Sequence, residues 1–230
     1  MSDLGGVWRT VGGRRIFIKD GEDLETAMKN SGKFGNKQNK MTDEYKKIEN
    51  FDEEIKELEE ESDRVYAKAR EMGTIGGINT YTEEYYMDVN YYLRNNDFPP
   101  GATEPYKEYV KKVTLGTEKT INEYQLKENL ITYKGTSSKY YEDYNVGDTF
   151  EMKEFNSTSI NKKVAESVFL DKENPYTLEI RVNKGTNAMY LGKNSANSNE
   201  YELLINRNIS YKVIEKNEKR MILEVVKNVK

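Results

Sequence analysis

The chain has 230 residues, of which 36% are hydrophobic and 33% are charged, and its 36 Lys and Arg against 40 Asp and Glu give a net charge of −4. This balance disfavours nucleic acid or an anionic membrane surface as a partner, and no stretch approaches the roughly 20 apolar residues that a membrane span needs. The chain contains no His and no Cys, which excludes a Ser-His-Asp triad, a thiolate nucleophile, disulfides and zinc sites built from these residues.

The first 40 residues are rich in glycine and carry more basic than acidic side chains. Residues 11–18 predict a turn and a short strand, and residues 31–40 predict a flexible linker. No apolar segment typical of a signal peptide lies near the N-terminus. Because the absence of Cys fits several compartments, the cytoplasm, a virion and export by a non-classical route all stay open.

Residues 41–72 predict one amphipathic helix, with twice as many acidic as basic side chains and an acidic face that we expect to be solvated. The glycine run 73–77 is expected to end it. The apolar positions recur at steps that include three and four residues: Ile48, Phe51, Ile55, Leu58, Val65, Tyr66, Ala69 and Met72. More helix is expected at 82–95 and, after a break at 99–101, over 104–130 with an interruption near Leu115-Gly116.

From residue 131 onwards the pattern changes to short runs of β-branched and aromatic residues, interrupted by one predicted helix at 161–169. The predicted strands are 131–133, 149–152, 176–182, 188–191, 201–205, 209–214 and 221–226. Helices that precede strands, rather than alternating with them, indicate an α+β fold.

Without His and Cys, acid–base chemistry falls to carboxylates, Lys, Tyr and hydroxyls. Lys134, in Tyr133-Lys134-Gly135, could hold a phosphate or be an ordinary surface lysine beside a turn glycine. Ser157 and Ser159 would share one face of a strand, although Ser159 also suits the cap of the following helix.

Two further candidates, Glu200 and Glu202, follow the long polar loop 192–199. On a strand, these carboxylates would point to the same side, where each would raise the pKa of the other. The alternative is an exposed strand edge that carries charges, which is common. Glu202 runs directly into an apolar strand, which favours the first interpretation.

Taken in order, these segments resemble the mono-ADP-ribosyltransferase toxins, above all the enzymatic components of the binary actin-modifying toxins. The likeness rests on three motifs, which are Tyr133-Lys134-Gly135 at the end of a predicted strand, Ser157-Thr158-Ser159 and Glu200-Tyr201-Glu202. Residues 81–94, with Tyr-Thr-x-x-x-Tyr-x-x-x-Asn-x-x-Leu-Arg, extend it, and it spans about 75–216. The resemblance implies two packed, mostly antiparallel β-sheets that form an NAD cleft and are preceded by helices. The domains expected are a basic segment and linker at 1–40, an amphipathic helix at 41–72 and a catalytic domain at 73–230.

The resemblance also implies roles for single residues. Glu202 would be the catalytic glutamate, Ser157 would hydrogen-bond it, and Glu200 would position the acceptor, a glutamate here going with arginine as the target. NAD would be the co-substrate, and no metal would be needed. The remaining residues that the resemblance assigns to the NAD site and the strand pair around it are Lys134, Gly135, Tyr81, Tyr86, Asn90, Thr158 and Ser159.

Two positions depart from the family pattern. Lys134 stands where the family has Arg. A lysine ammonium group would contact a phosphate as a point charge, whereas the planar guanidinium of arginine would form two parallel hydrogen bonds with it. Asn197 stands three residues before Glu200, where the family often has an aromatic residue that recognises the protein target. The acceptor, and actin in particular, therefore cannot be inferred from the toxins.

Residues 7–21 resemble a segment of phage minor head proteins. The partners expected are a target protein with an acceptor arginine and a phage capsid or toxin-delivery component, with no nucleic acid and no membrane span. Two alternatives to the transferase stay open. One is an NAD glycohydrolase, in which water is the main acceptor. The other is a phage structural or interaction protein on an inactive transferase fold.

Overall fold

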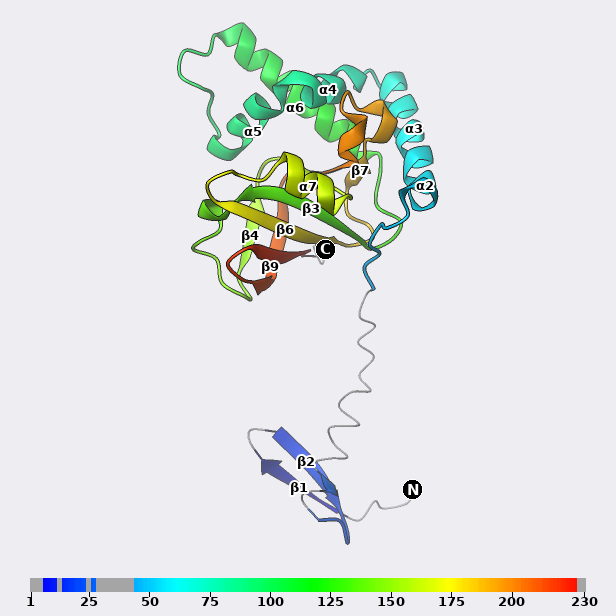
Figure 1. The fold of residues 1–230 in the computed structure, drawn as a ribbon, viewed down its shortest axis with the longest axis vertical. Coiled ribbons are helices and arrows are strands. Elements are labelled where there is room, and N and C mark those ends of the chain that lie inside the picture. Colours follow the sequence, from blue (N-terminus) through cyan, green and yellow to red (C-terminus); the bar gives the residue numbers. More distant parts are fainter. Residues whose placement is uncertain (1–5, 12–13, 24–25, 28–43, 227–230) are drawn as a thin grey trace. The chain divides into compact units, whose positions relative to one another are not determined.

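The structure is a computed structural model that describes residues 6–11, 14–23, 26–27 and 44–226. The chain divides into two compact units, Met1–Glu44 and Tyr45–Lys230 (Figure 1). In the first unit, strand β1 (Gly6–Val11) pairs antiparallel with β2 (Arg14–Lys19). The linker predicted at 31–40 lies outside the described residues.

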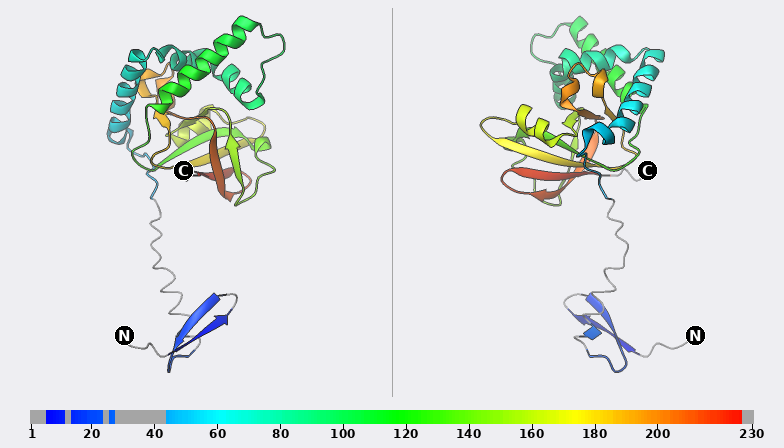
Figure 2. Two further views of the ribbon diagram at one scale, coloured as in Figure 1. Left: turned by 180° about the vertical axis from the view of Figure 1, so that it is seen from behind. Right: turned by 45° about the vertical axis from the view of Figure 1, so that its right-hand side comes forward.

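The second unit begins with helices, which gather on one side of its strands (Figure 2). They are α2 (Phe51–Glu54), α3 (Lys56–Glu71), α4 (Ile75–Thr80), the π-helical turn η1 (Tyr81–Tyr85), α5 (Tyr86–Asn95) and α6 (Glu104–Asn122). The single helix predicted over 41–72 is wrong at its start, because the helical backbone begins only at Phe51. Before it, Lys46 forms a parallel bridge with Leu130, so this stretch follows the sheet instead.

The glycine run 73–77 ends the preceding helix as predicted, because α3 stops at Glu71 and the chain turns at Gly73, where φ is 70°. Its last residues, Gly76 and Gly77, lie inside α4, which begins at Ile75. The interruption predicted near Leu115-Gly116 is wrong, because α6 continues through Gly116. A Cβ atom at Gly77 would lie 2.6 Å from the Cα of Gly116. Glycine at these two positions therefore lets the backbones of α4 and α6 approach closely, because a side chain at either position would not fit between them.

The strands of the second unit form one hydrogen-bonded sheet in the order β4-β9-β10-β6-β3-β5-β8-β7. Their bounds are β3 (Leu130–Ser137), β4 (Thr149–Met152), β5 (Asn156–Ser159), β6 (Pro175–Val182), β7 (Ala188–Tyr190), β8 (Glu202–Ile205), β9 (Ile209–Lys216) and β10 (Arg220–Val225). All neighbours are antiparallel except β10 and β6. The α+β class is confirmed, but two separate sheets are not. Between β3 and β5 only one residue pair, Tyr133 and Ser159, joins the two halves of the sheet.

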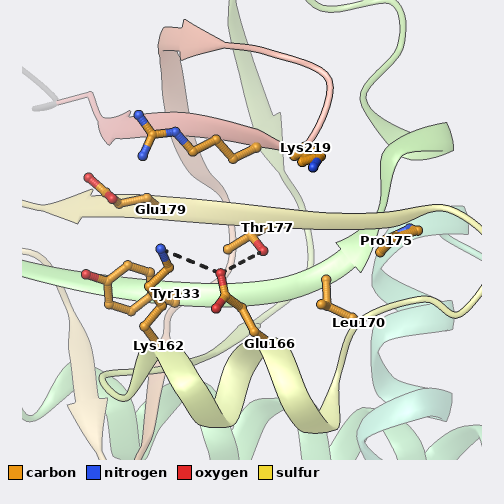
Figure 3. A pocket seen from close by; sticks show the side chains of 9 residues that line it. Tyr133, Lys162, Glu166, Leu170, Pro175, Thr177, Glu179 and Lys219 are labelled. Atoms are coloured by element: carbon orange, nitrogen blue, oxygen red, sulfur yellow. Dashed lines mark hydrogen bonds and ion pairs between the residues drawn. The ribbon is translucent and has the colours of Figure 1, made fainter.

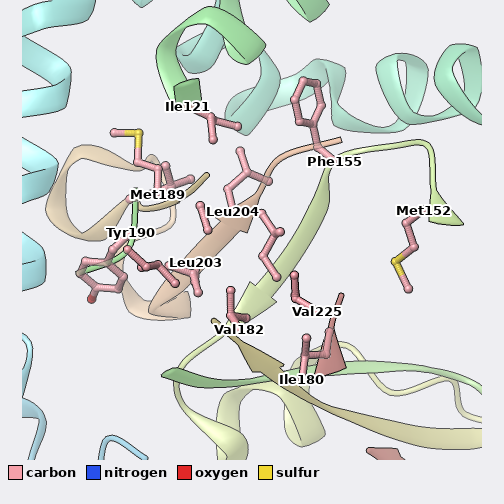
Figure 4. Packing of buried hydrophobic residues seen from close by; sticks show 14 of the residues in the cluster. Ile121, Met152, Phe155, Ile180, Val182, Met189, Tyr190, Leu203, Leu204 and Val225 are labelled. Atoms are coloured by element: carbon pink, nitrogen blue, oxygen red, sulfur yellow. The ribbon is translucent and has the colours of Figure 1, made fainter. Parts of the chain in front are cut away.

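The apolar core lies where the two halves of this sheet and the helices meet. All four residues of β8 are buried, which explains its continuous apolar run. Figure 4 shows Leu203 and Leu204 between Ile121 of α6 and Val182 of β6. Helix α7 (Lys162–Val168) follows β5 and packs near β3 (Figure 1). Within the described ranges, no helix is long and apolar enough to cross a membrane.

Candidate active site

Every residue that the sequence analysis assigned to catalysis or to NAD lines a single cavity of about 340 Å³. That volume is within the range of small-molecule sites. The cavity lies between the η1–α5 segment and the strands β3, β5 and β8. The predicted residues on its walls are Tyr81, Tyr86, Asn90, Lys134, Gly135, Ser157, Thr158, Ser159, Glu200 and Glu202.

Glu202 is the first residue of β8 and is held from the neighbouring strand. The antiparallel register pairs Ser159 with Glu202, and the Ser157 hydroxyl donates a hydrogen bond of 2.6 Å to Glu202 Oε1. The Glu202 side chain is buried, with the residue only 8% exposed. Burial raises its pKa to about 7, although the Ser157 hydrogen bond acts against the rise. Glu202 therefore changes its charge near neutral pH.

Glu200 reaches the cavity by another route than the one predicted. It ends a short 3₁₀ turn, η4 (Ser198–Glu200), and Tyr201 has the left-handed backbone angles φ 49° and ψ 45°. The prediction that Glu200 and Glu202 share one face of a strand is therefore wrong, because β8 begins only at Glu202. Both carboxylates still line the cavity. Burial raises the pKa of Glu200 above its usual value.

The hydroxyls of β5 fasten this strand to its neighbours. Thr158 donates to the Leu203 carbonyl at 2.6 Å, and Ser159 donates to the Glu200 carbonyl at 2.6 Å. The alternative role of Ser159 as a helix cap is not what the structure shows. Asn161 is the N-cap of α7 and accepts from the Lys163 amide. Ser159 instead ties the turn that carries Glu200 to β5.

Lys134 on β3 is the predicted basic side chain of the cavity. Its Nζ donates to Asn156 Oδ1 at 2.8 Å, and burial lowers its pKa to about 8, although the nearby Glu154 carboxylate acts in the opposite direction. The adjacent Gly135 has a packing role, because a Cβ atom there would lie 2.3 Å from the Ala165 carbonyl oxygen of α7. Lys134 and Gly135 are neighbours inside β3, and not at its end as predicted, so the charged side chain and the close approach of α7 occur at the same stretch of this strand.

The helical wall presents Tyr81, Tyr86 and Asn90. Asn90 Nδ2 donates to the Tyr81 hydroxyl at 3.1 Å, and the Tyr81 ring meets Phe155 edge-on at 5.3 Å between ring centroids. The Asn90 Oδ1 atom is buried and has no hydrogen-bond partner in the structure. A buried acceptor is costly unless it is paired, so this atom suits a donor group on a ligand. Tyr86 is 46% exposed.

The cavity also contains residues that the sequence analysis did not assign to it. Arg94 lies one helical turn beyond Asn90 on α5 and pairs with Glu154 at 3.6 Å, so the helical spacing could have indicated it. No sequence pattern marked Phe169, which directly follows α7. The unassigned lining residues are Thr82, Met87, Arg94, Tyr133, Phe169 and Asn197.

A second cavity, of about 370 Å³, lies between α7 and the strands β3 and β6 (Figure 3). Here Glu166 pairs with Lys162 at 3.6 Å and accepts from Thr177 at 3.4 Å. None of the carboxylates or hydroxyls predicted to be catalytic lines it. In the part of the chain that the structure describes, no group of three or more Asp and Glu side chains could hold a metal ion.

Comparisons with known proteins agree with this geometry. The sequence model of the ADP-ribosyltransferase exoenzyme family matches residues 75–230. The NAD(+)–arginine ADP-ribosyltransferase EFV of Enterococcus faecalis is 34% identical over 161 residues. That match covers 68% of this chain but only 31% of the relative, so the chain spans about a third of the length of this protein.

Solved structures show the same fold at low identity. The Clostridium limosum C3 exoenzyme has a TM-score of 0.62 and 19% identity, with 81% of this chain and 99% of that chain covered. The toxin BECa of C. perfringens, solved with NADH, has a TM-score of 0.58 and 18% identity, covering 77% and 49%. The ADP-ribosyltransferase Vis, solved with agmatine, has a TM-score of 0.54 and 17% identity, covering 75% and 86%. These structures show the shared fold. The family model, which matches more than half of the chain, shows that this chain belongs to the ADP-ribosyltransferase exoenzyme family.

Proposed function

We propose that this chain transfers the ADP-ribose of NAD to an arginine of a target protein and releases nicotinamide. The observation that carries this proposal is the arrangement of two carboxylates in one cavity. Glu202 is buried and hydrogen-bonded by Ser157, and Glu200 lies two residues earlier on the same wall. The similarity to an NAD(+)–arginine ADP-ribosyltransferase supports it.

The first half of the reaction breaks the bond between the ribose C1′ and the nicotinamide nitrogen. The bonding electron pair leaves with nicotinamide and neutralises its ring, so positive charge develops on the ribose. A fixed carboxylate stabilises such a charge most where water is excluded. Glu202 provides this carboxylate once it is ionised, and the Ser157 hydrogen bond favours the ionised form.

In the second half, a guanidino nitrogen of the acceptor forms the new bond to C1′ and loses a proton. Glu200 is suited to both tasks that this requires. As a carboxylate it pairs with a guanidinium, and the burial that raises its pKa makes it a better proton acceptor than an exposed glutamate.

For NAD itself, we propose that the Lys134 ammonium group faces the phosphates and that Asn90 Oδ1 accepts from a polar group of the dinucleotide. Lys134 offers a point charge and not the bidentate fork of an arginine. The aromatic residues Tyr81, Tyr86 and Phe169 would provide apolar surface for the rings. We also propose that the acceptor is a protein with an accessible arginine and that a phage capsid or toxin-delivery component is a further partner.

The test is an assay with radiolabelled NAD and agmatine as a small guanidino acceptor. The wild-type protein is expected to release nicotinamide and to form ADP-ribosyl-agmatine. Glu202→Gln should abolish both products, while Glu200→Gln should abolish transfer and retain nicotinamide release. Release by the wild type without transfer would indicate a glycohydrolase instead. The complete absence of turnover, in a protein that binds a capsid component, would favour the structural alternative.

A further inference from the structure

One face of α3 is attached to the loop that carries Glu200. Residues 59 and 66, which are two turns apart, and the adjacent residues 62 and 63 between them lie on one side of the helix. The loop between β7 and β8, residues 191–201, which we call the β7–β8 loop, lies beside α3 (Figure 1). The sequence analysis expected the charged face of this helix to be solvated. The structure shows that part of it contacts this loop instead.

Polar contacts join the two segments. The buried Ser62 hydroxyl donates to the Leu191 carbonyl at 3.1 Å. Asn194 Nδ2 donates to Asp63 Oδ1 at 2.9 Å and to the Ser62 hydroxyl at 3.2 Å. Lys193 forms an ion pair of 2.7 Å with Asp63. Two adjacent residues of α3 therefore contact three residues of the loop, Leu191, Lys193 and Asn194.

Close packing adds to these hydrogen bonds. Gly192 has a positive φ of 49°, and a Cβ atom there would lie 2.6 Å from the Glu59 side chain of α3. At the other end of the loop, the ring of Phe51 in α2 packs against Tyr201, with 4.8 Å between ring centroids. The loop is thus fixed from the helical side at both ends.

The backbone next to Glu200 is also held from the end of β5, because the Ile160 amide donates to the Tyr201 carbonyl at 3.1 Å, at the end of the β7–β8 loop. Inside it, the Glu200 amide donates to the Asn197 carbonyl at 3.0 Å, and outside it, Ser159 holds the Glu200 carbonyl. The Glu202 side chain, in contrast, is bonded by Ser157 of the sheet. Loosening α3 from the loop should therefore move Glu200 more than Glu202.

We propose that α3, through Ser62 and Asp63, positions Glu200 for the acceptor and so favours transfer to a guanidino group over transfer to water. This inference rests on the proposed function and deepens it. The family match begins at residue 75, so α3 lies outside it. The inference assigns this preceding helix a role in positioning Glu200. Ser62 and Asp63 act as positioning residues, because neither lines the cavity.

The experiment compares the double variant Ser62→Ala/Asp63→Ala with a matched control, Lys127→Ala. Like Lys193, Lys127 is a partly exposed lysine that pairs with acidic residues of α3, in this case Glu57 and Glu61. Unlike Lys193, it is not part of the β7–β8 loop. The double variant should lower kcat/KM for agmatine about tenfold by raising KM. The reason is that the free energy contributed by one buried hydrogen bond and one surface ion pair corresponds to a change of about this size. Nicotinamide release without an acceptor should stay within about twofold.

A second measurement is independent of activity. Hydrogen exchange of the amides of residues 192–200 should become about tenfold faster in the double variant and stay unchanged in Lys127→Ala. If the double variant does not fold, Lys193→Ala, which changes only an exposed side chain, should show a smaller effect in the same direction.

Three results would overturn the inference. They are an equal loss of transfer and nicotinamide release, an unchanged kcat/KM for agmatine, and the same loss in Lys127→Ala. If the wild-type protein releases nicotinamide but transfers nothing to agmatine, the proposed function fails and the role of Glu200 with it. Hydrogen exchange would then still report whether α3 holds the loop.

Discussion

The two carboxylates of the cavity lie two residues apart and are held by different kinds of structure. Glu202 begins a buried strand and is placed by the register of β8 against β5 and by the Ser157 hydroxyl. Glu200 ends a turn of the β7–β8 loop and is placed by Ser159 and, through the loop, by side chains of α3. The sheet thus fixes one carboxylate, while side-chain contacts from a distant segment fix the other.

This difference separates the two halves of the proposed reaction. Glu202 is buried, and a fixed carboxylate stabilises a developing charge more strongly there than in water. Glu200 belongs to a loop whose side chains and anchors can differ without any change to the sheet. Changes to side chains that hold Glu202 should therefore affect every turnover of NAD, whereas changes to side chains that hold the Glu200 loop should affect the choice of acceptor.

The largest expected effect is on the free energy of unfolding, because the buried carboxylate of Glu202 destabilises the fold when it is ionised. Burial raises the pKa of Glu202 from 4.5 to about 7, so ionisation destabilises the fold as pH rises from about 4.5 through 7. Replacing Glu202 by Gln should remove this cost and raise the free energy of unfolding by about 3 kcal/mol at pH 8, but by much less at pH 5. Thermal unfolding at both pH values measures it. An equal change at pH 5 and pH 8 would contradict the assignment of a buried, ionising carboxylate.

Ser157→Ala tests the strand side through activity. Losing a hydrogen bond to a charged group should lower nicotinamide release about 10- to 100-fold, and transfer to agmatine by the same factor. Because this bond lowers the pKa of Glu202, the acid limb of the pH profile should also move upward. Steady-state kinetics from pH 5 to 9 measures both effects. A selective loss of transfer would place Ser157 on the acceptor side instead.

Ser159→Ala is the matched variant for the loop side. Ser159 lies on the same strand, but its hydroxyl holds the Glu200 carbonyl. We expect transfer to agmatine to fall about fivefold, because a neutral hydrogen bond contributes about 1 kcal/mol. Nicotinamide release should stay nearly unchanged. Product analysis with and without agmatine measures the ratio, and a parallel loss of both activities would remove the contrast between the two serines.

The smallest effect at neutral pH is expected from Lys134→Arg. In the wild-type protein, kcat/KM for NAD should rise as Glu202 ionises near pH 7 and fall as Lys134 loses its charge near pH 8. Arginine keeps its charge at these pH values. The variant should thus differ by less than about twofold at pH 7, while its alkaline limb moves upward and its acid limb stays. An unchanged alkaline limb would show that Lys134 does not set it.

Sequence patterns predicted the strands better than the helix boundaries. Short β-branched and aromatic runs located β4 at Thr149–Met152 and the hairpin of β9 and β10 within two residues. Helix boundaries were predicted wrongly where a glycine is needed for close packing of two helices. Gly77 and Gly116 indicate breaks by local propensity, but they lie inside α4 and α6, because two helices touch there.

The sequence by itself determined that this is an α+β protein without imidazole or thiol chemistry, because hydrophobic periodicity and residue type are properties of neighbouring positions. The resemblance to the ADP-ribosyltransferase toxins, carried by motifs in a fixed order, assigned ten of the residues that line the cavity. The tertiary structure alone decided how Glu200 is presented, with Tyr201 in the left-handed conformation and α3 attached to the loop. The physical reason is that these contacts join residues about 130 positions apart, and a polar side chain gives no sign in the sequence of whether water or a distant backbone will be its partner.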